Sequence, residues 1–426
     1  MRYDVVIIGG GPSGMMAAGR SGELGARVLL LEKGGGLGTK LLMTGGGRCN
    51  ITNNTQGPKE MALRYGKAAR FMRTSLYEFG PAEVVAFFEG RGVKTKIEEG
   101  GRVLPVSNDA GYVLDVLVAY LDASNVEVRL GAEVREIVKK NNSIKALILA
   151  GGEEVTAGRF LIATGGVSYP ASGSTGDGYA FAKAAGHSII PPRPALTTVI
   201  AEGGQAAGLK GLSLSGVKVA LYKNNKKVAE DTGDVIFTAN GLGGPVVMDM
   251  SRAVGEALAG QVAPRSGSVE LRLDLAASFD FKALERRLIE GLDKAPRRLP
   301  EKALEELLPQ RLAKAVIEQA GIRGGKKSGE ITRAERKRVV GLLKEFTLSV
   351  RKLAGFERAF ITAGGVELSQ VDPRTMQSRI IENLYLAGEV LDIDGPTGGY
   401  NLQVSWSTGY VAGTATARRR VFLLLK

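Results

Sequence analysis

Short, continuous apolar runs mark the beginning of the chain. DVVII at residues 4–8 is rich in β-branched residues, as in a parallel strand that is buried on both faces. A glycine turn follows, then a stretch with small residues at 15–25, and then a second apolar run, ARVLLLE, at 26–32. This order predicts a strand, a helix and a second parallel strand, which is the start of an α/β fold.

The same pattern returns later in the chain. RFLIATGG at 159–166 predicts a strand that ends in a glycine turn, and a loop and a helix are expected within 169–186. Residues 384–413 predict a strand, an acidic turn, a glycine loop and a long helix that ends at about Arg418. Glycine loops of a ligand-binding kind therefore occur near both ends of the chain.

The middle of the chain carries two other periodicities. Apolar and polar residues alternate from 196 to about 275, which predicts antiparallel strands with a turn at Asn224 and Asn225. From 280 to about 355, apolar residues recur at helical spacing. A β-rich part followed by a helical part is expected here.

The first glycine turn has the spacing of a dinucleotide-binding loop. Gly9, Gly11 and Gly14 form G-x-G-x-x-G, and Glu32 ends the second strand. The first glycine allows a tight turn, the second lets the backbone approach a pyrophosphate, and the third lets the helix pack closely. Glu32 can bind a ribose in either NAD or FAD. Glycine loops at both ends of the chain favour the longer, two-ended cofactor, FAD.

Composition narrows the chemistry. The chain has one cysteine and one histidine, His187, which excludes an internal disulfide and a zinc site built from these residues. No apolar run reaches eighteen residues, and glycines interrupt the apolar N-terminal run, so neither a membrane span nor a signal peptide is expected. No metal is expected, and the cytoplasm is the expected compartment.

Positive charge is concentrated in one segment. The formal net charge is +13, and residues 281–358 hold 20 lysines and arginines against 11 acidic residues. Such a segment suits RNA as a partner, and Arg336, Lys337 and Arg338 are the densest run of candidate contacts. A solvated helical face is the alternative interpretation, because few aromatic residues are available there to stack on bases.

Seven motifs extend over nearly the whole chain, from residue 9 to residue 403. They are GGGPSG, TGGGRCNITN, GGRVLPVS, ATGG, STGDG, TAGGV and GEVLDIDGPTGGYNLQ. In these motifs the chain resembles the HI0933-like family of FAD-binding oxidoreductases. The resemblance implies a discontinuous, Rossmann-like FAD-binding domain at 1–190 and 356–426. An inserted β-rich domain at 191–278 and an inserted basic helical domain at 279–355 are implied between its halves.

The motif TGGGRCNITN at residues 44–53 is expected to lie beside FAD. Its glycines leave backbone N–H groups uncovered and allow positive φ. Arg48 can neutralise a phosphate or substrate charge, and Asn50 and Asn53 can bind polar groups. Cys49 has two interpretations: a proton donor with a lowered pKa, or a small buried residue packed against the flavin.

The glycine loop before the last helix is expected at the flavin ring. A helix N-terminus there would stabilise the negative charge of reduced flavin. Tyr400 is either a ring-stacking residue or an ordinary core aromatic. Asp177 either contacts flavin or caps a helix. Arg102 is either a substrate contact or an exposed turn residue, and His187 is expected at the surface.

The sequence and the resemblance together give a set of candidate site residues. The residues expected to contact FAD are Gly9, Gly11, Pro12, Ser13, Gly14, Glu32, Lys33, Thr44, Gly45, Gly46, Gly47, Arg48, Asn50, Ala163, Thr164, Gly165, Gly166, Asp177, Gly388, Glu389, Gly398, Gly399, Tyr400 and Asn401. The catalytic candidates are Cys49, Arg48 and Tyr400, and the substrate-contact candidates are Arg102, Arg336, Lys337 and Arg338.

The implied activity is reduction of an electron-poor C=C bond by hydride transfer from flavin N5. NAD(P)H is the expected transient reductant, and no second strand–GxGxxG–helix unit indicates a separate domain for it. Similar proteins are assigned to enone reduction, amine oxidation and uridine reduction in ribosomal RNA, and the basic segment favours the last. A non-catalytic flavin-containing scaffold that binds RNA or protein is the alternative from another class.

Overall fold

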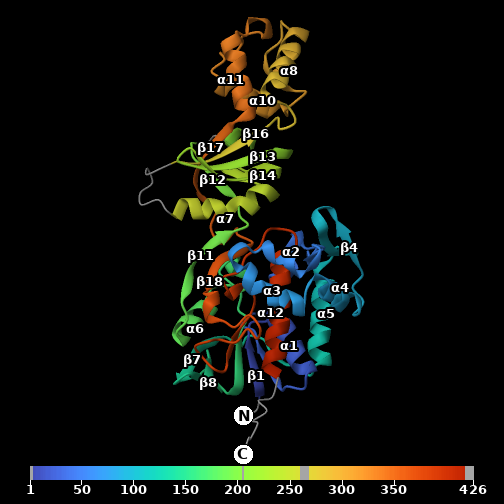
Figure 1. The fold of residues 1–426 in the computed structure, drawn as a ribbon, viewed down its shortest axis with the longest axis vertical. Coiled ribbons are helices and arrows are strands. Elements are labelled where there is room, and N and C mark those ends of the chain that lie inside the picture. Colours follow the sequence, from blue (N-terminus) through green and yellow to red (C-terminus); the bar gives the residue numbers. More distant parts are fainter. Residues whose placement is uncertain (1–2, 204–205, 260–267, 418–426) are drawn as a thin grey trace, which may run out of the picture. The chain divides into compact units, whose positions relative to one another are not determined.

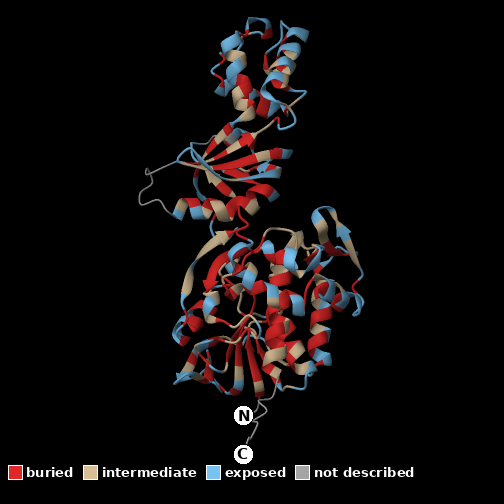
Figure 2. Cartoon of the chain, in the orientation of Figure 1, coloured by how far each residue is buried: buried red, intermediate tan, exposed pale blue. Residues whose placement is uncertain are grey.

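The computed structural model describes residues 3–203, 206–259 and 268–417. The chain divides into two compact units, one formed by residues up to Arg193 and from Phe360 onward, and the other by Pro194–Ala359. Each unit has its own buried core, drawn in red in Figure 2. The β-rich part and the helical part expected from the sequence share the second unit and its core.

A five-stranded sheet is the centre of the first unit, and its strand β1 is labelled in Figure 1. Its order is β19-β10-β1-β2-β6, and all neighbouring strands are parallel. The strands are β1 (Tyr3–Ile8), β2 (Val28–Leu31), β6 (Glu127–Arg129), β10 (Ala157–Ile162) and β19 (Leu384–Leu386). The apolar runs predicted as strands at both ends of the chain therefore meet in one sheet, which confirms the α/β fold. Because the strands are parallel, their carboxyl ends lie along one edge.

Two helices, α1 (Pro12–Glu23) and α12 (Tyr400–Ala417), pack closely against each other. A Cβ on Gly409 would stand 2.5 Å from the carbonyl oxygen of Ser13, and one on Gly413 would stand 2.6 Å from another α1 carbonyl oxygen. Larger side chains at these two glycines would separate the helices. The small residues thus bring the two ends of the sequence together beside the sheet.

Further helices and small sheets complete the first unit. The helices are α2 (Gly57–Leu63), α3 (Ala69–Glu78), α4 (Pro81–Glu89), α5 (Ala110–Ala123) and α6 (Asp177–Ala185). The strands are β3 (Thr52–Asn53), β4 (Thr95–Glu98), β5 (Arg102–Pro105), β7 (Val134–Lys140), β8 (Ser143–Leu149), β9 (Glu154–Val155), β11 (Ile189–Ala195) and β18 (Ile361–Val366). The helix end expected at about Arg418 lies outside the described residues.

A closed barrel is the centre of the second unit, with the strand order β12-β15-β14-β13-β16-β17. Its strands are β12 (Val199–Ala201), β13 (Ser213–Lys223), β14 (Lys226–Phe237), β15 (Gly241–Gly243), β16 (Val269–Asp274) and β17 (Phe346–Leu353). Asn224 and Asn225 join β13 to β14 with φ values of 52° and 61°. This confirms the predicted turn, since two residues with positive φ match the twist of the paired strands.

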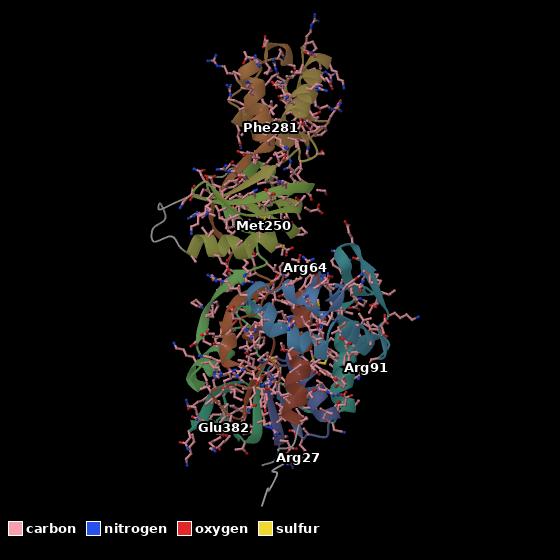
Figure 3. The ribbon with its side chains drawn as sticks, viewed as in Figure 1. Arg27, Arg64, Arg91, Met250, Phe281 and Glu382 are labelled. Carbon is pink, nitrogen blue, oxygen red and sulfur yellow. The ribbon has the colours of Figure 1, made fainter. Side chains whose placement is uncertain are left out.

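One segment predicted as strand is a helix, so that prediction is wrong. Within the stretch expected to alternate, residues 245–259 form α7 (Pro245–Ala259). Val246, Met250 and Val254 are buried at four-residue spacing, and Met250 is labelled in Figure 3. Four-residue spacing places these side chains on one face of a helix, against the apolar core of the barrel unit.

The helical prediction also extends too far. The helices are α8 (Phe281–Lys294), α9 (Glu301–Leu304), α10 (Gln310–Gln319) and α11 (Arg333–Lys344). Residues 346–353, expected to be helical, instead form β17, which pairs with β12 and β16 and closes the barrel. Phe346, Leu348 and Val350 are buried on alternate positions, which is the period of a strand.

His187 is buried, so its expected place at the surface is wrong. Its side chain is covered by a segment from the far end of the sequence: Nε2 lies 2.9 Å from Ser378 Oγ, and Nδ1 lies 3.2 Å from the Ala182 carbonyl oxygen. A carbonyl only accepts, so Nδ1 carries the proton and Nε2 accepts from the serine hydroxyl. Ser378 Oγ accepts in turn from the N–H groups of Ile380 and Ile381. Burial lowers the pKa of His187.

The protein is expected to lose stability as the pH falls below about 6.5, the ordinary histidine value. The lowered folded-state pKa of His187 means that the unfolded chain takes up the proton first. The contribution is full above the unfolded pKa and is lost as the pH falls toward the folded one. Urea unfolding of wild type and His187→Gln at pH 7.5 and 5.5 measures this. An equal pH dependence of the two proteins would contradict the prediction.

Candidate functional site

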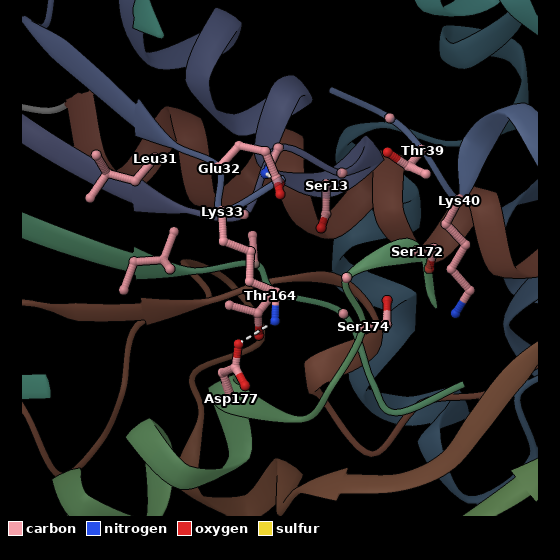
Figure 4. Close-up of a pocket in the computed structure, with 18 of the residues that line it drawn as sticks. Ser13, Leu31, Glu32, Lys33, Thr39, Lys40, Thr164, Ser172, Ser174 and Asp177 are labelled. Carbon is pink, nitrogen blue, oxygen red and sulfur yellow. Dashed lines mark hydrogen bonds and ion pairs between the residues drawn. The ribbon is translucent and has the colours of Figure 1, made fainter. Parts of the chain in front are cut away.

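A pocket lies at the carboxyl ends of β1, β2 and β10 (Figure 4). Its empty space, with open solvent included, is about 850 Å³. Of the residues expected to contact FAD, those that line the pocket are Gly9, Gly11, Pro12, Ser13, Glu32, Lys33, Ala163, Thr164, Gly165, Asp177 and Glu389. Open α/β sheets bind ligands at this edge, so the loops predicted from separate motifs form one site.

The three motif glycines have different surroundings. A Cβ on Gly9, where φ is 107°, would stand 2.5 Å from the Ala163 carbonyl oxygen, and one on Gly14 would stand 1.9 Å from the Gly9 carbonyl oxygen. Among the described residues, no atom lies within 4 Å of the same position on Gly11. Gly9 and Gly14 therefore allow close packing, whereas Gly11 exposes backbone to open space beside the N-terminus of α1. This fits a pyrophosphate.

Glu32 lies at the end of β2 and orders the adjoining loops. Its Oε2 accepts a hydrogen bond of 2.7 Å from the N–H of Gly10, and its Oε1 accepts one of 2.7 Å from the N–H of Gly34. A carboxylate oxygen has more than one acceptor site, so the same oxygens can also accept from ribose hydroxyl groups. The carboxylate thus fits the adenosine end of a dinucleotide.

Thr164 is a half-buried residue whose hydroxyl oxygen is buried. Its Oγ1 has no hydrogen-bond partner among the described residues, although buried hydroxyl groups are nearly always hydrogen-bonded. The residue lines the pocket. A polar ligand at this edge of the sheet would satisfy the hydroxyl, which is a second observation that fits a bound dinucleotide.

Two lysine–carboxylate pairs lie at the pocket. Lys33 forms an ion pair with Asp177, marked by a dashed line in Figure 4. Asp177 is the first residue of α6, after the N-cap Gly176, and its Oδ1 accepts a hydrogen bond of 2.8 Å from the Thr175 hydroxyl group. Lys40 Nζ lies 2.9 Å from Glu389 Oε2. Lys40 was not predicted, although its place after the glycine loop at 34–38 was a usable signal.

Glu389 joins distant segments of the first unit. Its Oε1 accepts a 2.7 Å hydrogen bond from the N–H of Thr362 and a 2.9 Å hydrogen bond from the Ser168 hydroxyl group. Lys40 Nζ also donates to the same serine at 2.6 Å. The carboxylate is therefore held by three groups from three parts of the sequence, in addition to lining the pocket.

The loop that contains TGGGRCNITN has the backbone expected of it. Gly45, Gly46 and Gly47 have φ values of 59°, 69° and 88°. Asn50 Oδ1 is buried without a hydrogen-bond partner among the described residues, so it can accept from a ligand. Thr44 Oγ1 donates instead to a backbone carbonyl oxygen within the loop.

Cys49 does not have the lowered pKa that the proton-donor interpretation needs. Its side chain is fully buried, and burial raises the pKa of the thiol to about 12. A hydrogen bond with Thr44 offsets only part of this effect. Of the two interpretations, the geometry favours the packing residue.

The Cys49 thiol is expected to resist labelling in the folded protein. With a pKa of about 12, only roughly one thiol in ten thousand is ionised at pH 8. Reaction with a maleimide should therefore be about a thousandfold slower than in urea-unfolded chain. Mass spectrometry of timed samples measures the rates. Rapid labelling of folded protein that is loaded with FAD would contradict the buried placement of Cys49.

Tyr400, the first residue of α12, is a core residue in this structure. It is 6% exposed, and its ring meets the Tyr65 ring edge to face at 6.4 Å. Its hydroxyl group lies 2.9 Å from Thr55 Oγ1, and its carbonyl oxygen accepts from the Tyr65 hydroxyl group. These contacts favour the core interpretation over stacking on a ring.

Other residues of the C-terminal loop hold that loop together. Asn401 accepts from the N–H of Gly395 and donates to the carbonyl oxygens of Gly395 and Pro396. Gly398 and Gly399 have φ values of 101° and 102°, which glycine tolerates best. Asn401 therefore shapes the loop from within, through contacts with its backbone.

Two further predicted glycines pack against protein groups. A Cβ on Gly166 would stand 2.4 Å from Thr362 Oγ1, and one on Gly388 would stand 2.4 Å from Ser13 Oγ. Their lack of a side chain lets these segments approach one another. Both glycines therefore allow close contact between segments of the first unit.

The basic run of Arg336, Lys337 and Arg338 lies in the second unit, whereas the residues that line the pocket belong to the first unit. Arg338 Nε donates to the Ala320 carbonyl oxygen at 2.8 Å, and Arg336 donates to the Ile331 carbonyl oxygen at 3.0 Å. Lys337 is exposed. Two of the three candidate RNA contacts therefore hold local backbone in α11 and its neighbours.

Within the part of the chain that the structure describes, no helix is both long and apolar enough to cross a bilayer. The same residues include no group of three or more histidine, cysteine, aspartate or glutamate side chains placed to hold a metal ion.

Comparisons with known proteins extend over nearly the whole chain. The family model for the HI0933-like protein Rossmann domain matches residues 3–415. A 3-dehydro-bile acid delta(4,6)-reductase from Clostridium scindens is 34% identical, over 97% of this chain and 98% of the relative. A ribosomal RNA dihydrouridine synthase from Escherichia coli is 28% identical, over 96% of each chain.

Solved structures show a similar fold at low sequence identity. A 3-ketosteroid-delta4-(5alpha)-dehydrogenase from Rhodococcus jostii has a TM-score of 0.54 and 17% identity, with 98% of this chain and 97% of that one covered. A flavocytochrome c3 fumarate reductase has a TM-score of 0.51 and 16% identity, with coverage of 97% and 78%. At these identities the likeness is one of fold.

Proposed function

The chain belongs to the HI0933-like family of FAD-dependent oxidoreductases, and we propose that it reduces a C=C bond conjugated to a carbonyl group. The observation that carries this proposal is the pocket, which fits FAD as the hydride carrier. The open backbone at Gly11, the Glu32 carboxylate and the Thr164 hydroxyl, which has no partner among the described residues, meet at one sheet edge. The bile-acid reductase relative supports C=C reduction as the reaction.

The chain's own residues bind and orient the cofactor. Bound FAD supplies the hydride that reaches the substrate carbon. The loop from Gly9 to Gly14 and the N-terminus of α1 would bind the pyrophosphate, and Glu32 would bind the ribose. The N-terminus of α12, after Gly398 and Gly399, would hold the flavin end and favour negative charge there.

NAD(P)H is the proposed reductant. Among the described residues, the dinucleotide-binding unit occurs once, at β1, α1 and β2. NAD(P)H would therefore bind transiently, supply electrons to FAD and dissociate before the C=C substrate binds.

An anaerobic two-step experiment tests the proposal. Protein loaded with FAD is mixed with NADPH or NADH, and loss of flavin absorbance measures reduction. A 3-oxo-4-ene steroid or a simpler cyclic enone is then added, and return of the absorbance measures its reduction. Reduced protein that no member of an enone panel reoxidises would contradict C=C reduction.

Uridine in ribosomal RNA is the second candidate substrate. Its C5=C6 bond is also conjugated to a carbonyl group, and the excess of positive charge at 281–358 favours an RNA partner. The dihydrouridine synthase relatives support the same choice. Incubation of reduced protein with total RNA, followed by dihydrouridine mapping, decides between the two substrates.

A further inference from the structure

Three cationic side chains surround one carboxylate on the small sheet formed by β3, β5 and β4. Glu98 Oε2 lies 3.2 Å from Arg48 Nη1 and 3.9 Å from Arg102 Nη2, and Glu98 Oε1 lies 3.1 Å from Lys96 Nζ. The four side chains are between 26% and 39% exposed. Within this cluster, positive charge exceeds negative charge by two. An ordinary surface ion pair balances one charge with one.

The cluster borders the glycine loop that precedes α12. Asn53, Arg102 and Glu98 are opposite one another across the three strands. Asn53 Nδ2 donates to the Gly398 carbonyl oxygen at 3.1 Å. A Cβ on Gly398 would stand 3.5 Å from Arg102 Cγ. The excess positive charge therefore lies beside the loop that the proposed function assigns to the flavin end.

Both arginines are held in place by the backbone. Arg102 Nε donates to the Glu99 carbonyl oxygen at 3.0 Å, and Arg48 Nε donates to the Gly45 carbonyl oxygen at 3.4 Å. This leaves their terminal N–H groups for an oxyanion. A guanidinium group fixed at one nitrogen loses less freedom when it binds.

Glu98 already shows what the cluster binds. The hydrogen bond from Lys96 lowers the pKa of Glu98, and the charge of Arg48 lowers it further. The carboxylate is therefore ionised at neutral pH and occupies the position of an anion. An external carboxylate also presents a pair of oxygen atoms, as do the two non-bridging oxygens of a phosphodiester, and arginine binds either pair through two parallel hydrogen bonds.

We propose that Arg48, Lys96 and Arg102 form a subsite for an oxyanion of the substrate, which displaces Glu98. The inference rests on the proposed function only in placing the substrate near the Gly398 loop. The oxyanion has two possible sources, a side-chain carboxylate of a small enone or a phosphodiester of RNA. The subsite positions the substrate through its charge, away from the bond that is reduced.

Two matched probe pairs test the subsite on FAD-loaded protein by equilibrium dialysis. One pair is a 3-oxo-4-ene steroid with a side-chain carboxylate and its methyl ester. The other is a uridine-containing RNA fragment and the same fragment with methylphosphonate linkages. Wild type should prefer the charged member of one pair, and that pair identifies the source. Arg48→Gln and Arg102→Gln should each reduce this preference roughly tenfold or more.

The control and a reversed effect separate this role from a structural one. Arg135→Gln removes one positive charge from an exposed ion pair with Glu133 and should keep the wild-type preference. Glu98→Gln should tighten binding of the charged probe, because the internal competitor is neutralised. If the cluster had only a structural role, Glu98→Gln would weaken binding of the charged probe instead. Flavin content and unfolding temperature of each variant check that it is folded.

The outcomes distinguish the subsite from the proposed function. Equal affinity for both members of both pairs overturns the subsite, as does an equal loss of preference in Arg135→Gln. Preference for the charged probe that depends on Arg48 and Arg102 supports it, even when no C=C bond is reduced. Such charge-dependent binding without reduction of a C=C bond would contradict the proposed reaction and would leave the subsite supported.

Discussion

The Gly11→Val protein is expected to fold and to lose FAD. Gly11 has φ −81° and ψ −178°, an extended conformation that valine adopts readily. No atom of the residues that the structure describes lies within 4 Å of the position that its Cβ would take, so the protein accommodates the new side chain. The methyl groups would occupy the space of the pyrophosphate. Steric overlap of this kind costs about 3 kcal/mol, so FAD retention should fall about a hundredfold.

The amount of flavin released on denaturation measures FAD retention. The unfolding temperature of the apo-protein shows whether the variant folds. Gly14→Val is the matched control, because its Cβ would stand 1.9 Å from the Gly9 carbonyl oxygen. That variant should fail to fold rather than merely lose flavin. Normal flavin content in folded Gly11→Val would contradict the assignment of the loop. Chromatography that identifies the released cofactor as FMN would contradict a dinucleotide.

Removal of the Glu389 side chain is expected to have the second large effect. The side chain is 19% exposed, and that of Lys40 is 22% exposed. Glu389→Ala would leave the Lys40 ammonium group without its counter-charge and the Thr362 N–H without its acceptor. Because the pair is partly exposed, we expect a loss of about 2–3 kcal/mol in the free energy of unfolding. FAD retention should fall as well, because Glu389 lines the pocket.

A double-mutant cycle isolates the ion pair. Glu389→Gln keeps an acceptor for Thr362 and removes the charge, whereas Lys40→Met removes the cation and keeps the length of the side chain. The double variant should be more stable than the sum of the single losses predicts, because neither charge is then left alone. Urea unfolding of the apo-proteins gives the energies. Additive losses would show that Lys40 and Glu389 act independently.

Local backbone structure was predictable from the sequence, both near the pocket and at one turn of the barrel. The apolar runs before Gly9, Glu32 and Ala163 are strands of one parallel sheet because continuous β-branched runs suit burial on both faces. The turn at Asn224 and Asn225 was predictable because few residues other than glycine tolerate positive φ. In each case the information lies within a few neighbouring residues.

Elements of the barrel unit were less predictable. Residues 346–353 are too few to separate strand from helix by periodicity alone, and their partners β12 and β16 lie far away in the sequence. α7 follows glycines and lies between strands of the barrel, so the alternating pattern on either side of it predicts further strand there. Barrel closure is a non-local property, because a strand is stabilised by whichever strands pair with it.

The state of individual side chains was decided by tertiary structure alone. The sequence by itself determined the α/β class and the glycine loops, because backbone conformation and apolar period are local. Folding determined that Cys49 is buried with a raised pKa, that Lys40 pairs with Glu389, and that Arg48 meets Arg102 at Glu98. Burial and charge pairing depend on distances between segments that are far apart in the chain, and no local pattern records those distances.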